Sequence, residues 1–431
     1  MSRKSSPKKK RSANTVGRRI AIILFAVVVI AVAAIVFLAV RSGVGALEST
    51  TGIVQPDEEK IRAFEESSAQ AETEAPEELT DPNLEAAQKT LDTMTLEEKV
   101  YQLFVTSPDE LTGRRGTENA EGALQEQLQA MPVGGLILYE ANVYTADQVQ
   151  GMLHGVKETA KIPMLLGIDG EPGNDEGLNE FGIAEEAYET ASVYGENADA
   201  EGVRAMGKKL GADMKQVGFN VDFAPTADVL VEPANTEIGN RSFGTDPLLV
   251  STLVGEMIGG LHESGMMTCA KHFPGLASTT NNTNYTAVTS NRTMDELRQT
   301  ELIPFSTAID MGTDMIMVAH LRLPSVVEGD LPVSLSPIFI QQILRGEMGY
   351  QGVVITDSLQ KRAITGTYSS AEASVLAIQA GCDMILLPDD LPDAAQGILT
   401  AIENGDLSEE RINESVLRIL ELKSRYGLLQ K

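Results

Sequence analysis

The chain has 431 residues, of which 42% are hydrophobic, and this length suffices for one large folded domain with flanking segments or for two domains. Asp and Glu outnumber Lys and Arg by 62 to 34, so the formal net charge is −28 at pH 7. This charge argues against a nucleic-acid partner, because phosphate binding requires a basic surface. The two cysteines, Cys269 and Cys382, lie in apolar runs, which predicts two buried thiols rather than a disulfide or a metal site.

The N-terminal 40 residues have the features of a membrane anchor. Residues 1–19 contain eight Lys or Arg and no acidic residue, and residues 20–40 are apolar throughout. An apolar helix of this length spans a bilayer core of about 30 Å. The positive-inside rule places residues 1–19 in the cytoplasm as a basic tail and the chain after the span outside. The sequence therefore predicts a single-pass anchor in the cell membrane, with an extracytoplasmic domain.

Residues 41–83 are predicted to form a flexible linker. Residues 44–83 contain eleven acidic residues and only two basic ones, Lys60 and Arg62. A segment with so much charge and so little apolar surface cannot fold on its own. The folded domain is therefore predicted to span residues 84–431.

Eight short apolar runs alternate with helical patterns in this domain. The runs are 102–106, 133–139, 163–169, 219–225, 266–271, 315–320, 353–357 and 383–388. Segments such as 200–217 and 293–311 are long enough for a crossover helix, and residues 408–429 are predicted to form a closing amphipathic helix. Eight such repeats predict an α/β fold, a (β/α)8 barrel of the TIM type.

Charged residues lie at the C-terminal ends of several predicted strands, and in a parallel barrel those ends open onto one pocket. The β-branched run 353–357 is typical of a strand that is buried on both faces, and it ends in Asp357. A carboxylate there is costly unless it faces solvent or a ligand, so Asp357 is the leading catalytic candidate. Other polar residues in or at the ends of predicted strands are Asp169, Asp222, Lys271, His272 and His320.

Five segments resemble one known family in order and spacing. They are Lys271–Gly275, which reads Lys-His-Phe-Pro-Gly, and residues 162–169, 218–229, 241–247 and 352–359. Over about residues 90–428 the chain resembles glycoside hydrolase family 3, and within it the single-domain β-N-acetylhexosaminidases. The resemblance implies a barrel enzyme that hydrolyses a β-linked sugar with retention and uses no metal and no organic cofactor.

The resemblance also implies residue roles. It assigns the nucleophile, which attacks the anomeric carbon and forms a glycosyl-enzyme, to Asp357. It assigns sugar-hydroxyl contacts to Asp169, Arg241, Lys271 and His272, whose charges suit charge-assisted hydrogen bonds. Arg241 and Lys271 nearby would also hold Asp357 ionised at neutral pH.

Two segments depart from the family pattern. In hexosaminidases of this type, a loop after the Lys-His-Phe-Pro-Gly segment carries a histidine general acid/base and an aspartate that orients it. Aligned without gaps, this chain has Asn284 and Asn282 at those positions, and an asparagine amide does not titrate near neutral pH. After Asp169, the family has Gln-Glu-Gly-Gly-Arg, whereas this chain reads Gly-Glu-Pro-Gly-Asn, so Asn174 replaces the arginine that helps to fix the sugar.

Three explanations for the missing acid are open. Glu171, Asp175 or Glu176 could supply it from the loop after Asp169. The enzyme could act only on substrates whose leaving group needs little protonation. Alternatively, the domain could be a catalytically impaired, glycan-binding pseudoenzyme or scaffold, because loss of general acid–base help slows catalysis roughly 10²–10⁴-fold.

The anchor and the family resemblance together predict a membrane-anchored, extracytoplasmic glycosidase of the β-N-acetylhexosaminidase type. The expected substrate is an N-acetylglucosamine-containing glycan of the cell wall, such as peptidoglycan, and the expected assembly is a monomer.

Overall fold

The computed structural model describes residues 81–173, 177–327 and 329–429. The predicted basic tail, the predicted membrane span and nearly all of the predicted linker lie outside the described residues, as do residues 174–176. Among the described residues, no helix has the length and apolar character needed to cross a bilayer. The anchor at residues 20–40 therefore stays a prediction.

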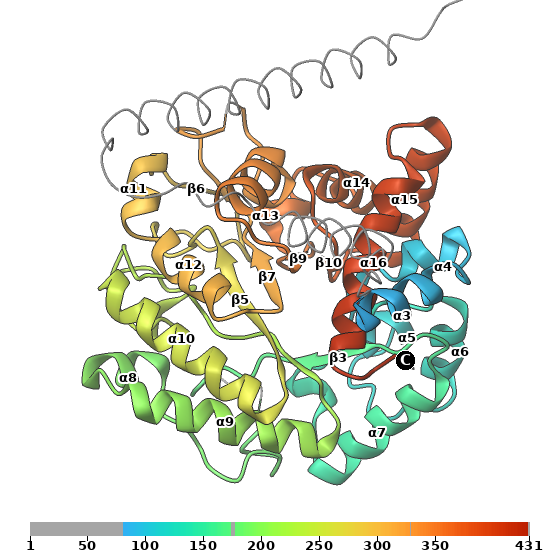
Figure 1. The fold of residues 1–431 in the computed structure, drawn as a ribbon, viewed down its shortest axis with the longest axis horizontal. Coiled ribbons are helices and arrows are strands. Elements are labelled where there is room, and N and C mark those ends of the chain that lie inside the picture. Colours follow the sequence, from blue (N-terminus) through green and yellow to red (C-terminus); the bar gives the residue numbers. More distant parts are fainter. Residues whose placement is uncertain (1–80, 174–176, 328, 430–431) are drawn as a thin grey trace, which may run out of the picture. The chain divides into compact units, whose positions relative to one another are not determined.

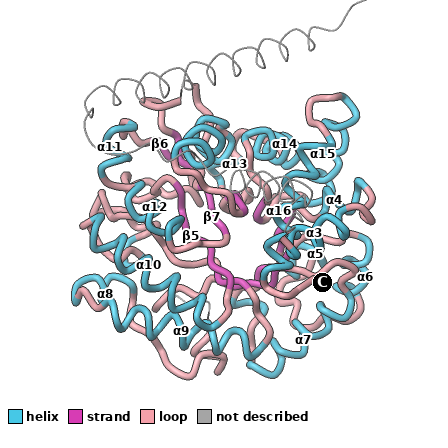
Figure 2. The backbone as a smooth tube through the Cα atoms, in the orientation of Figure 1, coloured by secondary structure: helices cyan, strands magenta, loops and turns pink. Residues whose placement is uncertain are grey.

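Eight parallel strands form the wall of a barrel, and helices surround it (Figures 1 and 2). The strands are β1 (Phe104–Thr106), β2 (Gly135–Ile137), β3 (Leu165–Ile168), β4 (Val221–Asp222), β5 (Met267–Phe273), β7 (Met315–Val318), β9 (Val353–Thr356) and β10 (Ile385–Leu386). Their order is β10-β1-β2-β3-β4-β5-β7-β9, with parallel pairing throughout. A parallel bridge between Ile355 and Met384 joins the two edges, so the barrel is nearly closed.

These strands confirm the predicted α/β barrel, since each of the eight predicted runs overlaps one of them. Residues 288–289 and 321–322 form a further two-stranded sheet, made of β6 (Val288–Thr289) and β8 (Leu321–Arg322), that was not predicted. Both cysteines are free, buried thiols, as expected.

The helices lie outside the barrel wall. They are α3 (Pro82–Leu91), α4 (Leu96–Tyr101), α5 (Pro108–Thr112), α6 (Ala123–Ala130), α7 (Ala146–Thr159), α8 (Ala191–Asn197), α9 (Ala200–Val217), α10 (Pro247–Ser264), α11 (Met294–Gln299), α12 (Leu302–Asp310), α13 (Arg362–Thr365), α14 (Ser370–Ala380), α15 (Leu391–Asn404) and α16 (Glu409–Arg425). Shorter or irregular turns are the 3-10 helices η2 (Glu140–Asn142), η3 (Gly239–Arg241) and η4 (Val333–Leu335), and the π-helix η5 (Ile338–Glu347).

The predicted crossover helices have different outcomes. Helix α9 has the predicted bounds of residues 200–217. The Asp199 side chain caps its N-terminus, and Gly218, with φ 115°, follows its last residue. The segment 293–311 instead forms two helices, because the backbone leaves helical geometry at Thr300. Glu301 follows this break, and its fully buried carboxylate accepts two hydrogen bonds from Arg292, of 2.7 and 2.6 Å.

Helix α16 closes the domain and, as predicted, buries one face. Lys423 belongs to that face and is fully buried, with its Nζ donating to Gln102 Oε1 at 2.7 Å. Burial disfavours the charged form of the amine and lowers the pKa of Lys423 to about 7.

This buried lysine predicts a pH-dependent stability. Between about pH 7 and pH 10 the unfolded chain holds the Lys423 proton and the folded chain has lost it, so the free energy of unfolding rises with pH over this window. Over this window, the free energy of unfolding of the wild type is expected to rise relative to that of Lys423→Met by about 1 kcal/mol per pH unit. Urea unfolding of both proteins near pH 7 and near pH 9 checks this, and a difference that does not change with pH contradicts it.

Candidate active site

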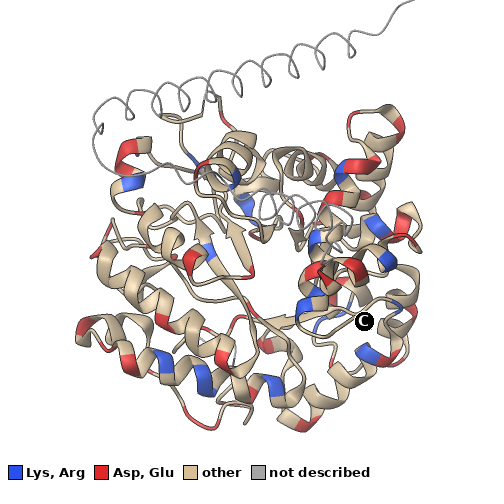
Figure 3. Cartoon of the chain, viewed as in Figure 1, with Lys and Arg blue, Asp and Glu red and all other residues tan. Residues whose placement is uncertain are grey.

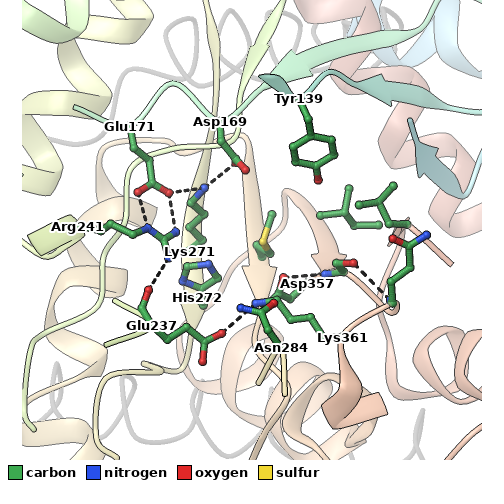
Figure 4. Close-up of a pocket in the computed structure, with 15 residues that line it drawn as sticks. Tyr139, Asp169, Glu171, Glu237, Arg241, Lys271, His272, Asn284, Asp357 and Lys361 are labelled. Carbon is green, nitrogen blue, oxygen red and sulfur yellow. Dashed lines mark hydrogen bonds and ion pairs between the residues drawn. The ribbon is translucent and has the colours of Figure 1, made fainter. Parts of the chain in front are cut away.

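Charged residues are spread mainly over the outer helices (Figure 3), but a second set lies at the strand ends inside the ring. A cavity of about 460 Å³ opens there, within the size range of small-molecule sites. The five residues expected to attack or bind the sugar all line it (Figure 4): Asp169, Arg241, Lys271, His272 and Asp357. Strand ends and a 3-10 helix that lie far apart in sequence therefore bring the predicted residues together.

Lys271 and Arg241 form an ion-pair network with two carboxylates. Lys271 Nζ, on β5, lies 2.7 Å from Asp169 Oδ1 and 2.6 Å from Glu171 Oε1. Arg241 donates two hydrogen bonds of 2.7 Å to Glu171. Burial alone would raise the pKa of Glu171, but Arg241 and Lys271 outweigh it and hold this pKa well below its usual range. Glu171 is therefore a fixed carboxylate, and its contacts disfavour the role of substitute acid.

His272 is held in place by the buried Asp228. The Nδ1 atom of His272 lies 2.8 Å from Asp228 Oδ2, and the backbone N–H of His272 donates to the same oxygen at 3.1 Å. Asp228 Oδ1 accepts the backbone N–H of Leu276, so one carboxylate fixes both the ring and the turn that follows β5. Within this turn Gly275 has φ 125°, and a Cβ there would lie 2.8 Å from the Glu301 side chain, so glycine is required.

Asp357 lies directly after β9 and is buried at the cavity wall. Its Oδ2 is 2.7 Å from Lys361 Nζ, and its Oδ1 accepts the Ser358 N–H at 2.7 Å. Burial alone would raise the pKa of Asp357, but the ammonium of Lys361 outweighs burial and lowers this pKa well below its usual range. Asp357 is therefore ionised at neutral pH, as a nucleophile must be.

His320 supports the turn that carries Asp357 and does not line the cavity. Its Nδ1 lies 2.8 Å from Ser334 Oγ, and its Nε2 lies 2.9 Å from the Ser358 carbonyl oxygen. A carbonyl can only accept, so Nε2 carries the proton and Nδ1 accepts from Ser334. Burial lowers the pKa of His320, which favours this neutral form.

Asp222 also supports the site from behind. Its Oδ1 accepts the Gly170 N–H at 2.8 Å, and burial raises the pKa of Asp222 well above its usual value. A Cβ at residue 170 would lie 2.9 Å from the Asp222 carboxylate oxygens, so glycine permits this close approach. The contact orders the turn that presents Asp169 to the cavity.

The loop after β5 brings Asn284 to the cavity, where its side chain is exposed. Its backbone N–H donates to Asn282 Oδ1 at 2.8 Å, and Asn282 itself does not line the cavity. The position that the resemblance assigns to the general acid/base thus reaches the site, but with an amide that does not titrate. The proposed substitutes Asp175 and Glu176 lie outside the described residues.

Several residues of the site were not predicted. Glu237, Lys361 and Tyr139 line the cavity, and Asp228 holds His272 from behind. Lys361 lies four residues after Asp357, a spacing that could have indicated a pair, whereas Glu237 lies in an irregular loop without a motif. Within the described residues, no group of three or more His, Cys, Asp or Glu side chains is arranged to hold a metal ion.

An ionised carboxylate that shares a cavity with Lys271 and Arg241 at the mouth of a parallel barrel is an arrangement that a glycosidase can use. Comparison with known proteins agrees: residues 95–422 match the family described as "Glycosyl hydrolase family 3 N terminal domain". The chain therefore belongs to glycosyl hydrolase family 3 and is a glycosidase, as the resemblance implied.

Relatives and solved structures agree with this assignment. A "Beta-hexosaminidase" of Idiomarina loihiensis is 32% identical over 270 residues, covering 62% of this chain and 80% of the relative. A "Beta-hexosaminidase" of Stenotrophomonas maltophilia is 30% identical over 298 residues, covering 67% and 87%. The structure of a family 3 β-N-acetylglucosaminidase from Paenibacillus sp. superposes with a TM-score of 0.72 at 32% identity, over 78% of this chain and 63% of that one.

Proposed function

We propose that the protein is a retaining β-N-acetylhexosaminidase that acts on N-acetylglucosamine-containing glycans, with cell-wall glycans such as peptidoglycan as the natural class. The observation that carries the proposal is that the ionised Asp357 shares one cavity with Asp169, Arg241, Lys271 and His272. Similarity to proteins named β-hexosaminidase supports the choice of sugar.

The cations at the site keep donors for a ligand. An ammonium has three N–H donors, and Lys271 uses two on Asp169 and Glu171, so one is left for a sugar hydroxyl. Arg241 has five donors and uses three, two on Glu171 and one on the Glu237 carbonyl oxygen at 3.0 Å. The remaining donors can hold vicinal hydroxyls and orient the ring for attack.

In the first step, a carboxylate oxygen of Asp357 attacks the anomeric carbon, and the bond from that carbon to the leaving oxygen breaks. The product is a glycosyl ester of Asp357 and a released alcohol, which needs one proton. In the second step, water attacks the same carbon and gives up a proton, and the ester bond breaks to return the Asp357 carboxylate. The anomeric configuration is inverted twice and so retained.

Two N-acetylglucosaminides with different leaving groups test this function on the full-length protein. One has an activated phenol, which leaves without protonation, and the other has an alkyl alcohol, which needs an acid. Hydrolysis of both is expected. Hydrolysis of the phenyl compound alone indicates that no group replaces the absent histidine. Measurable sugar binding without hydrolysis of either supports the rival function, a glycan-binding pseudoenzyme, which Asn284 at the cavity favours.

Lys361→Met is expected to shift the acid limb of the pH–activity profile to higher pH. Burial raises the pKa of Asp357, and Lys361 is the strongest group that opposes this. Without the cation, Asp357 is protonated at a higher pH and loses its nucleophilic form there. Lys361→Arg retains the charge and is expected to keep the wild-type acid limb. Profiles of kcat/KM on the activated phenyl substrate for the three proteins measure this, and identical acid limbs contradict the expectation.

The proposal includes the location of the enzyme. The basic residues 1–19, the apolar residues 20–40 and the acidic residues 41–83 support a single-pass membrane anchor with a cytoplasmic N-terminus and a linker to a monomeric, extracytoplasmic catalytic domain from residue 84 on. Deletion of residues 1–40 is expected to move the protein from the membrane fraction to the soluble fraction. Equal membrane association of both forms would contradict the anchor.

A further inference from the structure

Glu237 is a carboxylate of the cavity that has no role in the steps above. Glu237 lies in the loop between β4 and α10, and its side chain lines the cavity although only 3% of it is exposed. Its carboxylate accepts the backbone N–H of Thr283 at 2.7 Å and the Thr283 hydroxyl. Thr283 lies between Asn282 and Asn284, so Glu237 is hydrogen-bonded to the loop in which asparagines occupy the positions of the family's histidine and aspartate. Glu237 and Asn284 both point toward the cavity near Lys361 (Figure 4).

The distance between Glu237 and Asp357 is the second observation. Lys361 Nζ lies 2.7 Å from Asp357 Oδ2 and 3.1 Å from Glu237 Oε1. Since one nitrogen contacts both oxygens, these oxygens are at most 5.8 Å apart. The two carboxyl groups of retaining glycosidases stand about 5–5.5 Å apart, and those of inverting ones about 6.5–9.5 Å. These two oxygens are therefore closer than the separation typical of inverting enzymes, as a retaining pair requires.

We propose that Glu237 is the general acid/base of this enzyme, in place of the absent histidine. The assignment rests on the proposed hydrolysis and names the residue that completes it. In the first step, protonated Glu237 gives its proton to the leaving oxygen as Asp357 attacks the anomeric carbon. In the second step, the Glu237 carboxylate takes a proton from the attacking water as the ester bond to Asp357 breaks, which restores both groups.

Lys361 contacts both of the carboxylates that the two steps use. In the free enzyme, its ammonium is shared between Asp357 and Glu237. In the glycosyl-enzyme, Asp357 is a neutral ester, so Glu237 is the carboxylate that remains for the ammonium. Lys361 then contacts the carboxylate that the second step uses as its base.

Other described carboxylates of the cavity are less suited to the role. Glu171 is fixed by Arg241 and Lys271, and Asp169 contacts Lys271 at 2.7 Å. Both bind the cations that we assign to the sugar hydroxyls. Glu237 instead contacts the cation next to the nucleophile.

The test compares Glu237→Gln with wild type on the activated phenyl and the alkyl N-acetylglucosaminide. Gln has the same shape and still accepts the Thr283 N–H, but it carries no transferable proton. The variant is expected to lose roughly 10²–10⁴-fold in kcat/KM on the alkyl substrate and less than about 10-fold on the activated one. Glu232→Gln is the matched control, because Glu232 lies in the same loop, does not line the cavity and caps the Ala234 N–H. It is expected to act like wild type.

Azide gives a second readout that a structural role would not produce. In Glu237→Ala, the space left by the side chain admits a small anion next to the sugar ester of Asp357. Azide needs no base, so it attacks the anomeric carbon, the ester bond breaks, and a β-glycosyl azide forms with an increased rate of phenol release. Thermal unfolding of each variant checks the fold.

The outcomes separate the two proposals. The role of Glu237 alone is overturned by the following combination. The wild type hydrolyses both substrates, Glu237→Gln lowers kcat/KM equally on both or on neither, and no glycosyl azide forms. A wild type that hydrolyses neither substrate overturns the proposed function and this role with it. Loss that is confined to the alkyl substrate, together with the azide product, supports the assignment.

Discussion

Asp357→Ala is expected to lower kcat on the activated phenyl N-acetylglucosaminide by roughly 10⁴-fold or more, the scale of effect seen when a hydrolase loses its nucleophile. The leaving group of this substrate needs no acid, so the loss reports on the attack at the anomeric carbon alone. Lys361 keeps Glu237 as a partner in the variant, at 3.1 Å in the wild type, so the fold should persist. Steady-state rates and thermal unfolding of wild type and variant measure both effects.

Two further variants make this test specific. Asp357→Asn keeps the shape and the hydrogen bond from Ser358 but is a poor nucleophile, so it should lose activity to a similar extent. Glu232→Gln, which lies away from the cavity, should keep wild-type activity. Asp357→Ala with more than about one tenth of the wild-type kcat would contradict the assignment of the nucleophile.

Lys271→Met is expected to lower the free energy of unfolding by about 3 kcal/mol and to abolish sugar binding. Lys271 is buried and forms ion pairs with Asp169 and Glu171. In the variant, both carboxylates lose this cation, and Glu171 keeps its ion pair with Arg241. A buried charge that loses its partner is costly, whereas an exposed ion pair contributes little. Urea unfolding and a binding titration with N-acetylglucosamine measure the two losses.

Lys161→Met is the control for this variant. Lys161 forms an ion pair with Glu98 on the surface, and 67% of its side chain is exposed. Its replacement is expected to change the free energy of unfolding by less than about 1 kcal/mol and to leave sugar binding unchanged. Equal destabilisation by the two variants would show that the Lys271 network does not act as a buried ion pair.

The barrel was predictable because its signal repeats. Each strand is a short apolar run, and a chain with eight such runs between helical segments has few other ways to bury them. The helix break at Thr300 was not predictable, because it depends on the buried pair of Glu301 and Arg292, a tertiary contact. The residues of the predicted anchor lie outside the described part of the chain.

The half of the site that lies at strand ends was also predictable. Asp357 and Lys271 follow or end apolar runs, and the barrel geometry brings such positions to one mouth. Glu237 was not predictable, because it lies in an irregular loop and its contact with Lys361 joins residues 124 positions apart. The contacts of Glu171 with Arg241 and Lys271 were likewise not predictable, because they join residues far apart in sequence.

The most direct test of the whole account is the mass of the peptide that carries Asp357 after a reaction with the activated phenyl N-acetylglucosaminide is quenched in acid. Because Glu237→Gln slows the second step, this variant should accumulate the ester, and one N-acetylglucosaminyl group should be found on Asp357. Phenol release that continues with no sugar on this peptide, or with the sugar on another residue, would contradict the account.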